Sequence, residues 1–172
     1  FIRLYYSIFF IKSNNSIICI IKNGSVVFFD QNGLFLNQVT VGAMPDMITF
    51  NQDYTKVLTA NEGEPNATYS VDPEGSVSII NIAGGIAALT QANVTNISLS
   101  QYNGQEVALR AQGIRIFTSS ASVAQDLEPE YIAVSTDNTK AYVTLQENNA
   151  LLTIDLLTNT IVSLTPFGYS SY

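Results

Sequence analysis

Residues 45–56, PDMITFNQDYTK, and residues 129–140, PEYIAVSTDNTK, decide the fold. Each stretch begins with a proline and an acidic residue, continues through a short run of β-forming residues, and turns at an aspartate before a shared Thr-Lys pair. The two stretches lie 84 residues apart. A strand–turn–strand unit that recurs along a chain is the sequence signature of a repeat architecture.

Both copies continue in the same way, with a second apolar run, a polar acidic connection, and a third strand that ends in a turn. These segments are 57–60, 61–63 and 75–82 in the first copy, and 141–145, 146–148 and 149–156 in the second. A partial copy lies upstream, where 23–30 matches the third strand and 34–41 matches the fourth. Four strands joined in this order are the plan of a β-propeller blade of about 40–45 residues.

The rest of the chain also consists of short β-rich runs between turn residues, with almost no helical periodicity, which predicts an all-β protein. The segment 98–112 is the exception, because a short helix is expected around 105–111 as an excursion between strands. The expected strands are 16–21, 25–30, 34–41, 47–51, 56–60, 76–82, 87–90, 114–118, 131–135, 140–145, 150–156 and 160–165.

The copies amount to about two and a half four-stranded blades, whereas a closed propeller needs at least about four. The chain is therefore expected to be a fragment of a longer propeller; the alternative is a self-contained sandwich of three small sheets. Residues 1–21 are interpreted as an atypical N-terminal segment or edge strand. A signal-peptide remnant is a further interpretation, since Arg3 precedes a short apolar run. No stretch reaches the length of a membrane span.

Composition excludes several classes of function. The 172 residues carry 7 Lys and Arg against 14 Asp and Glu, a net charge of −7, so nucleic acid is not an expected partner. An apolar content of 47% with 12% charged residues is too hydrophobic for a disordered tail. Since there is no His and Cys19 stands alone, Ser-His-Asp catalysis, a His- or Cys-based zinc site and an internal disulfide are excluded.

Acidic side chains gather in the connections, and no Lys or Arg lies between 57 and 109 to offset the first group. Carboxylates held close together raise one another's pKa or bind a hard divalent cation, with Ca²⁺ the natural candidate. The loop NEGEPN at 61–66 adds oxygen donors but lacks the EF-hand pattern. A solvated surface that keeps an apolar domain soluble is the competing interpretation. The candidate ligands are Glu62, Glu64, Asp72, Glu74, Glu128, Glu130 and Glu147.

Arg110 and Arg115 are two of the few basic residues in the second half of the chain. They are expected either to pair with Glu106 or Asp126, or to form an anion site for a phosphate or a sulfated sugar.

Three polar residues recur at the ends of third strands, namely Asp30, Asn81 and Asp155. Their side chains are expected to cap turns by hydrogen bonds to the backbone. The tyrosines are expected in the core or on sheet faces, with a sugar-stacking surface as the alternative.

Sequons for N-glycosylation occur at Asn14, Asn66, Asn93 and Asn96. In a chain this rich in Asn, Ser and Thr, about three would arise by chance. Asn66, Asn93 and Asn96 are candidate glycan acceptors if the protein is secreted by a host that glycosylates.

Several long segments closely resemble the choice-of-anchor I domain family. They are GSVVFFDQNGLFLNQVTVGAMPDMITFN at 24–51, KVLTANEGEPN at 56–66, VDPEGSVSIINI at 71–82, NGQEVALRAQGIRIF at 103–117, and VAQDLEPEYIAVSTDNTKAYVTLQENNALLTIDL at 123–156. The resemblance covers about residues 23–172, so 22–172 is interpreted as a partial domain of this family. It implies a seven-bladed propeller related to YVTN and WD40-like repeats, at the cell surface or secreted. For the animal relatives it also implies an association with biomineral matrices, and it supplies no agreed catalytic activity.

Two hypotheses of function remain. The first is a non-enzymatic extracellular or cell-surface module that binds calcium, mineral, glycan, matrix or another protein through its acidic loops. The second is part of a metal-dependent phosphoesterase, with Ca²⁺ on the same carboxylates and Arg110 or Arg115 neutralising the phosphate.

Overall fold

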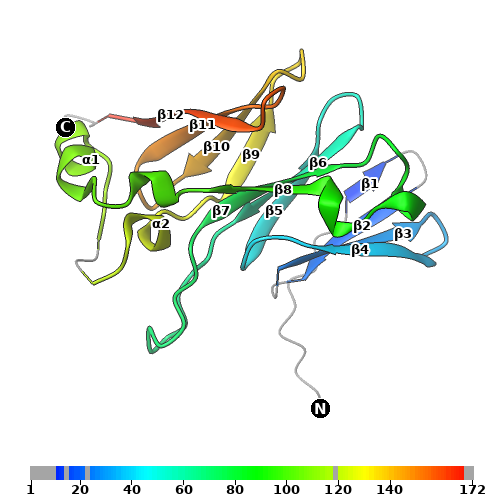
Figure 1. Ribbon diagram of the computed structural model, residues 1–172, viewed down its shortest axis with the longest axis horizontal. Coiled ribbons are helices and arrows are strands. Elements are labelled where there is room, and N and C mark those ends of the chain that lie inside the picture. The colour runs from blue at the N-terminus through cyan, green and yellow to red at the C-terminus, as the bar shows by residue number, and fades with distance from the viewer. Residues whose placement is uncertain (1–10, 14–15, 22–23, 118–119, 169–172) are drawn as a thin grey trace.

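The computed structural model describes residues 11–13, 16–21, 24–117 and 120–168, with side-chain burial described from residue 24 onward. The chain folds into three four-stranded antiparallel sheets arranged side by side along the molecule (Figure 1). The two α-helices lie at one end, beside the third sheet. The all-β expectation is confirmed.

Each sheet is a meander in which consecutive strands are hydrogen-bonded neighbours. Sheet 1 contains β1 (Ile11–Ser13), β2 (Ser16–Ile21), β3 (Ser25–Asp30) and β4 (Phe35–Thr40). Sheet 2 contains β5 (Pro45–Phe50), β6 (Lys56–Asn61), β7 (Ser76–Asn81) and β8 (Val94–Ser98). Sheet 3 contains β9 (Tyr131–Val134), β10 (Lys140–Leu145), β11 (Ala150–Asp155) and β12 (Thr160–Pro166).

The two repeat copies occupy equivalent places. β5 and β9 are the first strands of their sheets and contact each other, as neighbouring blades of a propeller do. The chain is therefore a β-propeller fragment rather than a sandwich. The partial upstream copy is a complete four-stranded sheet whose first strand, β1, has 3 residues.

Two apolar layers hold the sheets together. One lies between sheets 2 and 3 and includes Leu58, Ile79 and Ile132; the other joins sheets 1 and 2 through residues such as Phe28 and Val57. Since sheet 2 is covered on both faces, β6 and β7 are almost continuously buried. In β10, by contrast, buried and less buried residues alternate, because one face of sheet 3 is open.

The turns that follow the first strands share one structure. Asp53 accepts hydrogen bonds from the amide and hydroxyl of Thr55, at 3.1 and 2.6 Å, and Asp137 does the same for Thr139, at 3.0 and 2.8 Å. The Thr55 hydroxyl lowers the pKa of Asp53, and the Ser135 and Thr139 hydrogen bonds lower the pKa of Asp137 to about 2. The shared Asp-x-Thr of the repeat is thus a turn signal.

The expected turn caps are also present. Asp30 accepts from the amides of residues 32 and 34, Asn81 from that of residue 83, and Asp155 from those of residues 157 and 158. The capping interpretation of these three positions is confirmed.

Two expected strands are wrong. Residues 87–90 overlap a 3-10 helix, η1 (Ile86–Ala88), and the fourth strand of sheet 2 is instead β8, after η2 (Gln91–Asn93). Residues 114–118 contain no described strand, because Ile114 and Arg115 donate their amides to Leu109 O and Asn148 O. Their alternating burial therefore comes from a loop packed on the core.

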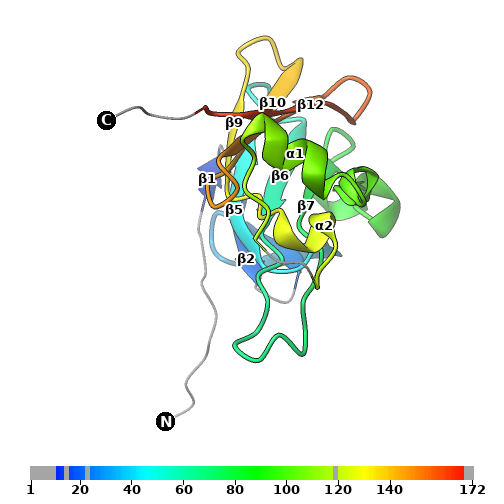
Figure 2. The ribbon, with the colours of Figure 1, turned by 90° about the vertical axis from the view of Figure 1, so that its left-hand side faces the viewer.

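The segment between sheets 2 and 3 contains short helices joined by irregular stretches, and Figure 2 views the molecule from that end. It contains η3 (Ser100–Tyr102), α1 (Glu106–Gln112) and α2 (Val123–Asp126). The expected helix around 105–111 is confirmed as α1, whereas α2 was not expected. None of the helices described is long and apolar enough to cross a membrane.

The tyrosines were expected in the core or on sheet faces; most of those described are exposed, and the two in sheet 3 lie on a sheet face. Tyr54, Tyr69 and Tyr131 are 52%, 66% and 61% exposed, and Tyr142 is 37% exposed. Tyr131 and Tyr142 lie on the open face of sheet 3, which has no neighbouring sheet among the described residues. Four other tyrosines, at positions 5, 6, 169 and 172, lie outside the described residues.

Candidate functional site

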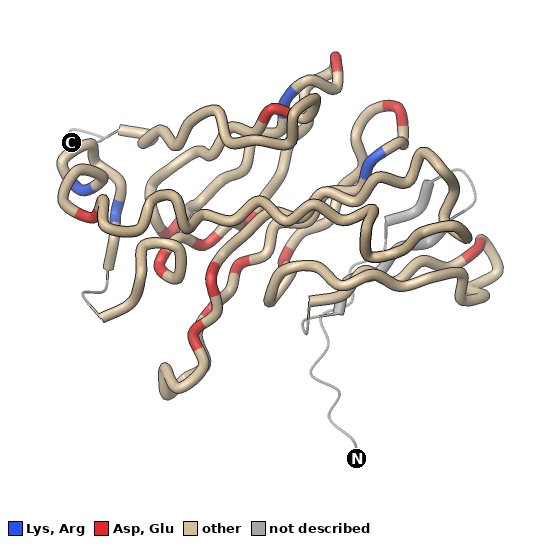
Figure 3. The backbone as a smooth tube through the Cα atoms, viewed as in Figure 1, with Lys and Arg blue, Asp and Glu red and all other residues tan. Residues whose placement is uncertain are grey.

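Topology places the acidic connections at one end of the sheets. In an antiparallel meander, the second-to-third-strand connections lie at the same end as the crossing to the next sheet. The loop 62–75, the crossing that ends at 127–130, and the turn 146–149 therefore share one face, and Figure 3 shows acidic residues gathered there. The Asp53 and Asp137 turns lie at the opposite end.

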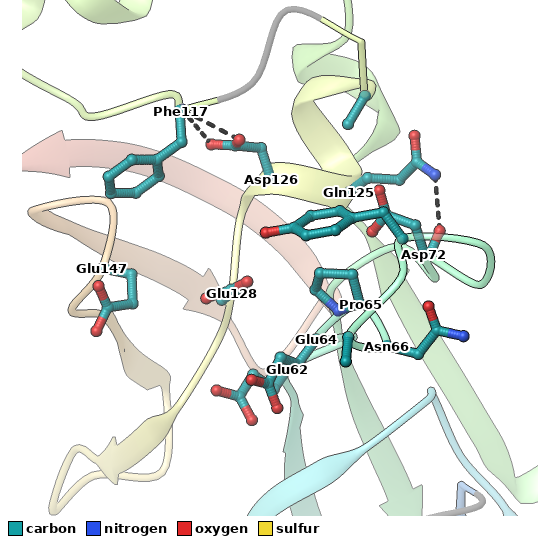
Figure 4. A pocket seen from close by; sticks show the side chains of 13 residues that line it. Glu62, Glu64, Pro65, Asn66, Asp72, Phe117, Gln125, Asp126, Glu128 and Glu147 are labelled. Carbon is teal, nitrogen blue, oxygen red and sulfur yellow. Dashed lines mark hydrogen bonds between the residues drawn. The ribbon is translucent and has the colours of Figure 1, made fainter.

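These three connections enclose an open cleft of about 1080 Å³, which we call the acidic cleft (Figure 4). None of its described lining residues is Lys or Arg. The lining residues are Glu62, Glu64, Pro65, Asn66, Ala67, Tyr69, Asp72, Phe117, Ala121, Gln125, Asp126, Glu128 and Glu147.

Two glycines shape the base of the loop 62–75. Gly63 has φ of 69°, and a Cβ there would lie 2.8 Å from the backbone of Glu74. A Cβ on Gly75 would overlap the carbonyl oxygen of Leu127 and lie 2.8 Å from Pro129 Cδ. Because neither position has room for a side chain, the loop base packs directly on the crossing to sheet 3.

Asn148 ties the other two connections together. Its side chain is fully buried; Nδ2 donates to Arg115 O at 2.9 Å and to Asp126 O at 2.7 Å, while Oδ1 accepts from Glu128 N at 3.0 Å. One amide thus positions the backbone on which Asp126 and Glu128 stand. The sequence offered no signal for this role beyond an asparagine in a turn.

The carboxyl of Glu128 has a strongly raised pKa. Partial burial raises the pKa of its carboxyl to about 7, and the negative charges of Glu62, Glu64, Glu147 and, least, Asp126 add to the effect. Carboxylates from all three connections therefore act electrostatically on Glu128, which lies among them in Figure 4.

Asp126 is not among the candidate ligands predicted from the sequence, where it is one of two possible partners for Arg110 or Arg115. Its side chain is 7% exposed, and its two oxygens accept from Phe117 N at 3.0 and 2.9 Å. The acidic run 126–130 was the available signal, but burial of its first member was not readable from the sequence.

Five of the seven candidate metal ligands line the acidic cleft, and two do not. Glu74 and Glu130 are not among the lining residues. Glu74 is exposed to solvent, and Glu130 accepts a hydrogen bond from Nε2 of Gln146, in the turn that follows β10. Within the described parts of the chain, no group of three or more Asp, Glu or Cys side chains is placed so that it could hold a metal ion. The carboxylates therefore share an electrostatic field without forming a preformed coordination shell.

The hydrogen bonds of both candidate anion-binding arginines go to backbone carbonyls. Arg110 donates through Nε and Nη2 to Ile116 O, at 3.0 and 2.8 Å, and Arg115 donates through Nη2 to Gln146 O at 2.9 Å. The Arg115 guanidinium also lies 5.9 Å from the Phe117 ring centroid. Neither arginine lines the acidic cleft.

The model of the choice-of-anchor I domain family matches residues 7–172. No curated protein matches the chain significantly. The match begins at residue 7, whereas the resemblance to the family was expected to begin at about residue 23.

Two solved structures share the fold. One is Kuenenia stuttgartiensis hydrazine synthase, with a TM-score of 0.54 and 15% identity over 88% of this chain and 34% of that chain. The other is the β-propeller domain of Myceliophteria thermophila Cps50 (Swd1), with a TM-score of 0.57 and 9% identity over 95% and 41%. The chain thus spans less than half of either structure. At these identities the likeness concerns the fold alone.

Proposed function

Because the chain belongs to the choice-of-anchor I domain family, we propose that it is part of a non-enzymatic binding module, secreted or held at the cell surface, whose acidic cleft recognises cations. Calcium is the first ligand to test. The partners in view are a matrix component, a mineral surface, a glycan or a protein that presents a cation to this cleft.

The observation that carries the proposal is the convergence of carboxylates from three separate connections. Glu62 and Glu64 come from one loop, Glu128 from the crossing between sheets, and Glu147 from a turn of sheet 3. No described lining residue carries a compensating positive charge. A cation entering the cleft would offset the repulsion among these carboxylates, which adds to partial burial in raising the pKa of Glu128.

The acidic cleft offers the ligand atoms that calcium prefers, but not a preformed arrangement of them. Its preference for oxygen ligands and its flexible geometry match a cleft rich in carboxylates. The described residues offer no preformed group of three ligands, however, so binding requires the loop 62–75 to adjust toward Glu128. We therefore expect weak binding that strengthens as the pH rises through 7, where Glu128 loses its proton.

The alternative, a metal-dependent phosphoesterase, needs a cationic group beside the carboxylates to receive the phosphate. Arg110 and Arg115 bond to backbone carbonyls and lie outside the cleft lining. No specific observation favours this function over binding. Turnover of a phosphoester panel that disappears on chelation would support it nonetheless.

Titration calorimetry with CaCl₂ at pH 8 tests the proposal. The protein should bind Ca²⁺, and the double variant Glu62→Gln with Glu64→Gln should lose at least about tenfold in affinity, the equivalent of about 1.4 kcal/mol. The matched control is Glu74→Gln with Glu106→Gln, which removes the same charge outside the cleft. Binding absent below millimolar Ca²⁺, or equal losses in both double variants, would overturn the role of the cleft.

A further inference from the structure

The loop 62–75 projects from the body of the protein, and a sequon lies in its outer part (Figure 2). Asn66, Ala67 and Thr68 are all exposed, and Asn66 stands in the lining of the acidic cleft. An oligosaccharide attached here would extend into solvent without displacing a packed side chain.

The hydrogen bonds around Asn66 are local. The Thr68 hydroxyl donates to Asn66 Oδ1 at 3.3 Å, the amide of Ser70 donates to the same oxygen at 2.9 Å, and Tyr69 N donates to Asn66 O at 2.8 Å. Every partner lies within five residues of Asn66. Because the turn needs no distant part of the fold, it can form in a chain that has not yet folded.

This turn suits the transfer of an oligosaccharide to the side-chain nitrogen of Asn66. The Thr68 hydroxyl, two residues onward, bonds to Asn66 Oδ1 and helps to hold the side-chain amide in an exposed turn. Asn66 Nδ2 donates to Ser70 Oγ at 2.9 Å, and the amide keeps one N–H after substitution, so this bond can survive.

The other sequons within the described residues are held differently, although Asn96 is also exposed. Asn93 is half-buried, and its Oδ1 caps η2 by accepting from the amide and hydroxyl of Thr90. Asn96 lies in β8, paired with Ser78, whose hydroxyl donates to Asn96 Oδ1. The sequon hydroxyl of Asn96, on Ser98, donates to Ser100 instead.

We propose that Asn66, of the sequons that the structure describes, is an N-glycan attachment site, placed in the lining of the acidic cleft. In the transfer, Asn66 Nδ2 loses a proton and forms a bond to C1 of an oligosaccharide carried on a polyprenyl diphosphate, and the lipid diphosphate leaves with the bonding electron pair. The inference rests on the proposed secreted or cell-surface location, because this donor acts on chains that enter the secretory pathway.

The test is to secrete the full chain, behind a leader peptide, from cultured eukaryotic cells. Mass spectrometry of the peptide that carries Asn66 should show a glycan, and glycosidase treatment should convert Asn66 to aspartate. The variants Asn66→Gln and Thr68→Ala should both lose the glycan, whereas Thr68→Ser, Asn93→Gln and Asn96→Gln should retain it. Thr68→Ala keeps Asn66 itself, so this loss cannot be attributed to removal of the asparagine.

An unmodified Asn66 in the secreted protein would overturn the inference, as would a glycan on Asn93 or Asn96 with Asn66 empty. The proposed function fails by a different result. If Asn66 carries the glycan and calorimetry on that protein shows no Ca²⁺ binding, the attachment site stands and the calcium proposal falls.

Discussion

Replacing Asn148 with alanine should destabilise the protein and loosen the acidic cleft. The Asn148 amide is fully buried and makes three hydrogen bonds of 2.7 to 3.0 Å, to the carbonyl oxygens of Arg115 and Asp126 and from the amide of Glu128. Alanine removes both ends of the amide and leaves these three backbone groups without that partner.

The magnitude follows from the count of bonds. A buried hydrogen bond contributes about 1 kcal/mol net, and a buried group left unsatisfied costs about 1–3 kcal/mol. The three groups together predict a loss of about 3 kcal/mol in the free energy of unfolding, less if water enters the vacated space. A domain of ordinary stability has about 5–15 kcal/mol, so the loss is large but leaves the protein folded.

Urea denaturation followed by circular dichroism measures this loss directly. Asn32→Ala is the matched control, because Asn32 is exposed and its substitution should change stability by less than about 0.5 kcal/mol. If Asn148→Ala loses less than about 1 kcal/mol with an unchanged denaturant slope, Asn148 does not hold the two connections, and the account of how Glu128 is positioned is wrong.

Three further predictions concern packing and charge. Gly75→Ala should lower the free energy of unfolding, measured by urea denaturation, by about 1–3 kcal/mol, because the new Cβ would overlap Leu127 O. The control Gly84→Ala has open space around its Cβ and should change stability little. Equal effects of the two substitutions would contradict the close packing at Gly75. Lys56→Met should destabilise by about 1 kcal/mol, because Lys56 Nζ donates across the sheet boundary to Leu156 O, and an unchanged midpoint would refute this contact. With a pKa raised from 4.5 to about 7, Glu128 keeps in the folded state a proton that the unfolded chain releases, so stability should fall as the pH rises from about 4.5 to about 7. Glu128→Gln should remove that fall and raise the free energy of unfolding at pH 8 by about 1 kcal/mol, after allowance for solvent screening. If the variant has the same pH profile of stability as the parent, the pKa of Glu128 is not raised.

The blade architecture was predictable because its signals are local. The Asp-x-Thr of the first turn and the Asp or Asn that ends the third strand each make hydrogen bonds within a few residues, so the same letters recur wherever the same turn recurs. The repeat therefore revealed the equivalence of β5 and β9 before any coordinates.

The segment between sheets 2 and 3 was less predictable, because its structure depends on distant partners. Ile114 and Ile116 are buried as strand residues are, yet Arg115 N bonds to Asn148 O, in the turn between β10 and β11, instead of to a strand neighbour. The exposed tyrosines of sheet 3 have a similar cause. Tyr131 and Tyr142 occupy a strand pattern, but the face on which they lie has no neighbouring sheet among the described residues.

The candidate site was predictable in composition and not in geometry. The gathering of acidic residues in the connections pointed to Glu62, Glu64 and Glu128, and topology brought them to one cleft. The burial of Asp126 and the central position of Glu128 arise from Asn148, a contact across 20 or more residues that no local pattern reveals.

Residue-specific titration of Glu128 by carboxyl ¹³C NMR tests the convergence of the three connections most directly. The account predicts a midpoint near 7 in the parent protein and a lower midpoint in the Glu62→Gln, Glu64→Gln double variant, because two of the neighbouring charges are gone. A Glu128 midpoint near 4.5 that is the same in both proteins would show that these carboxylates do not share a site.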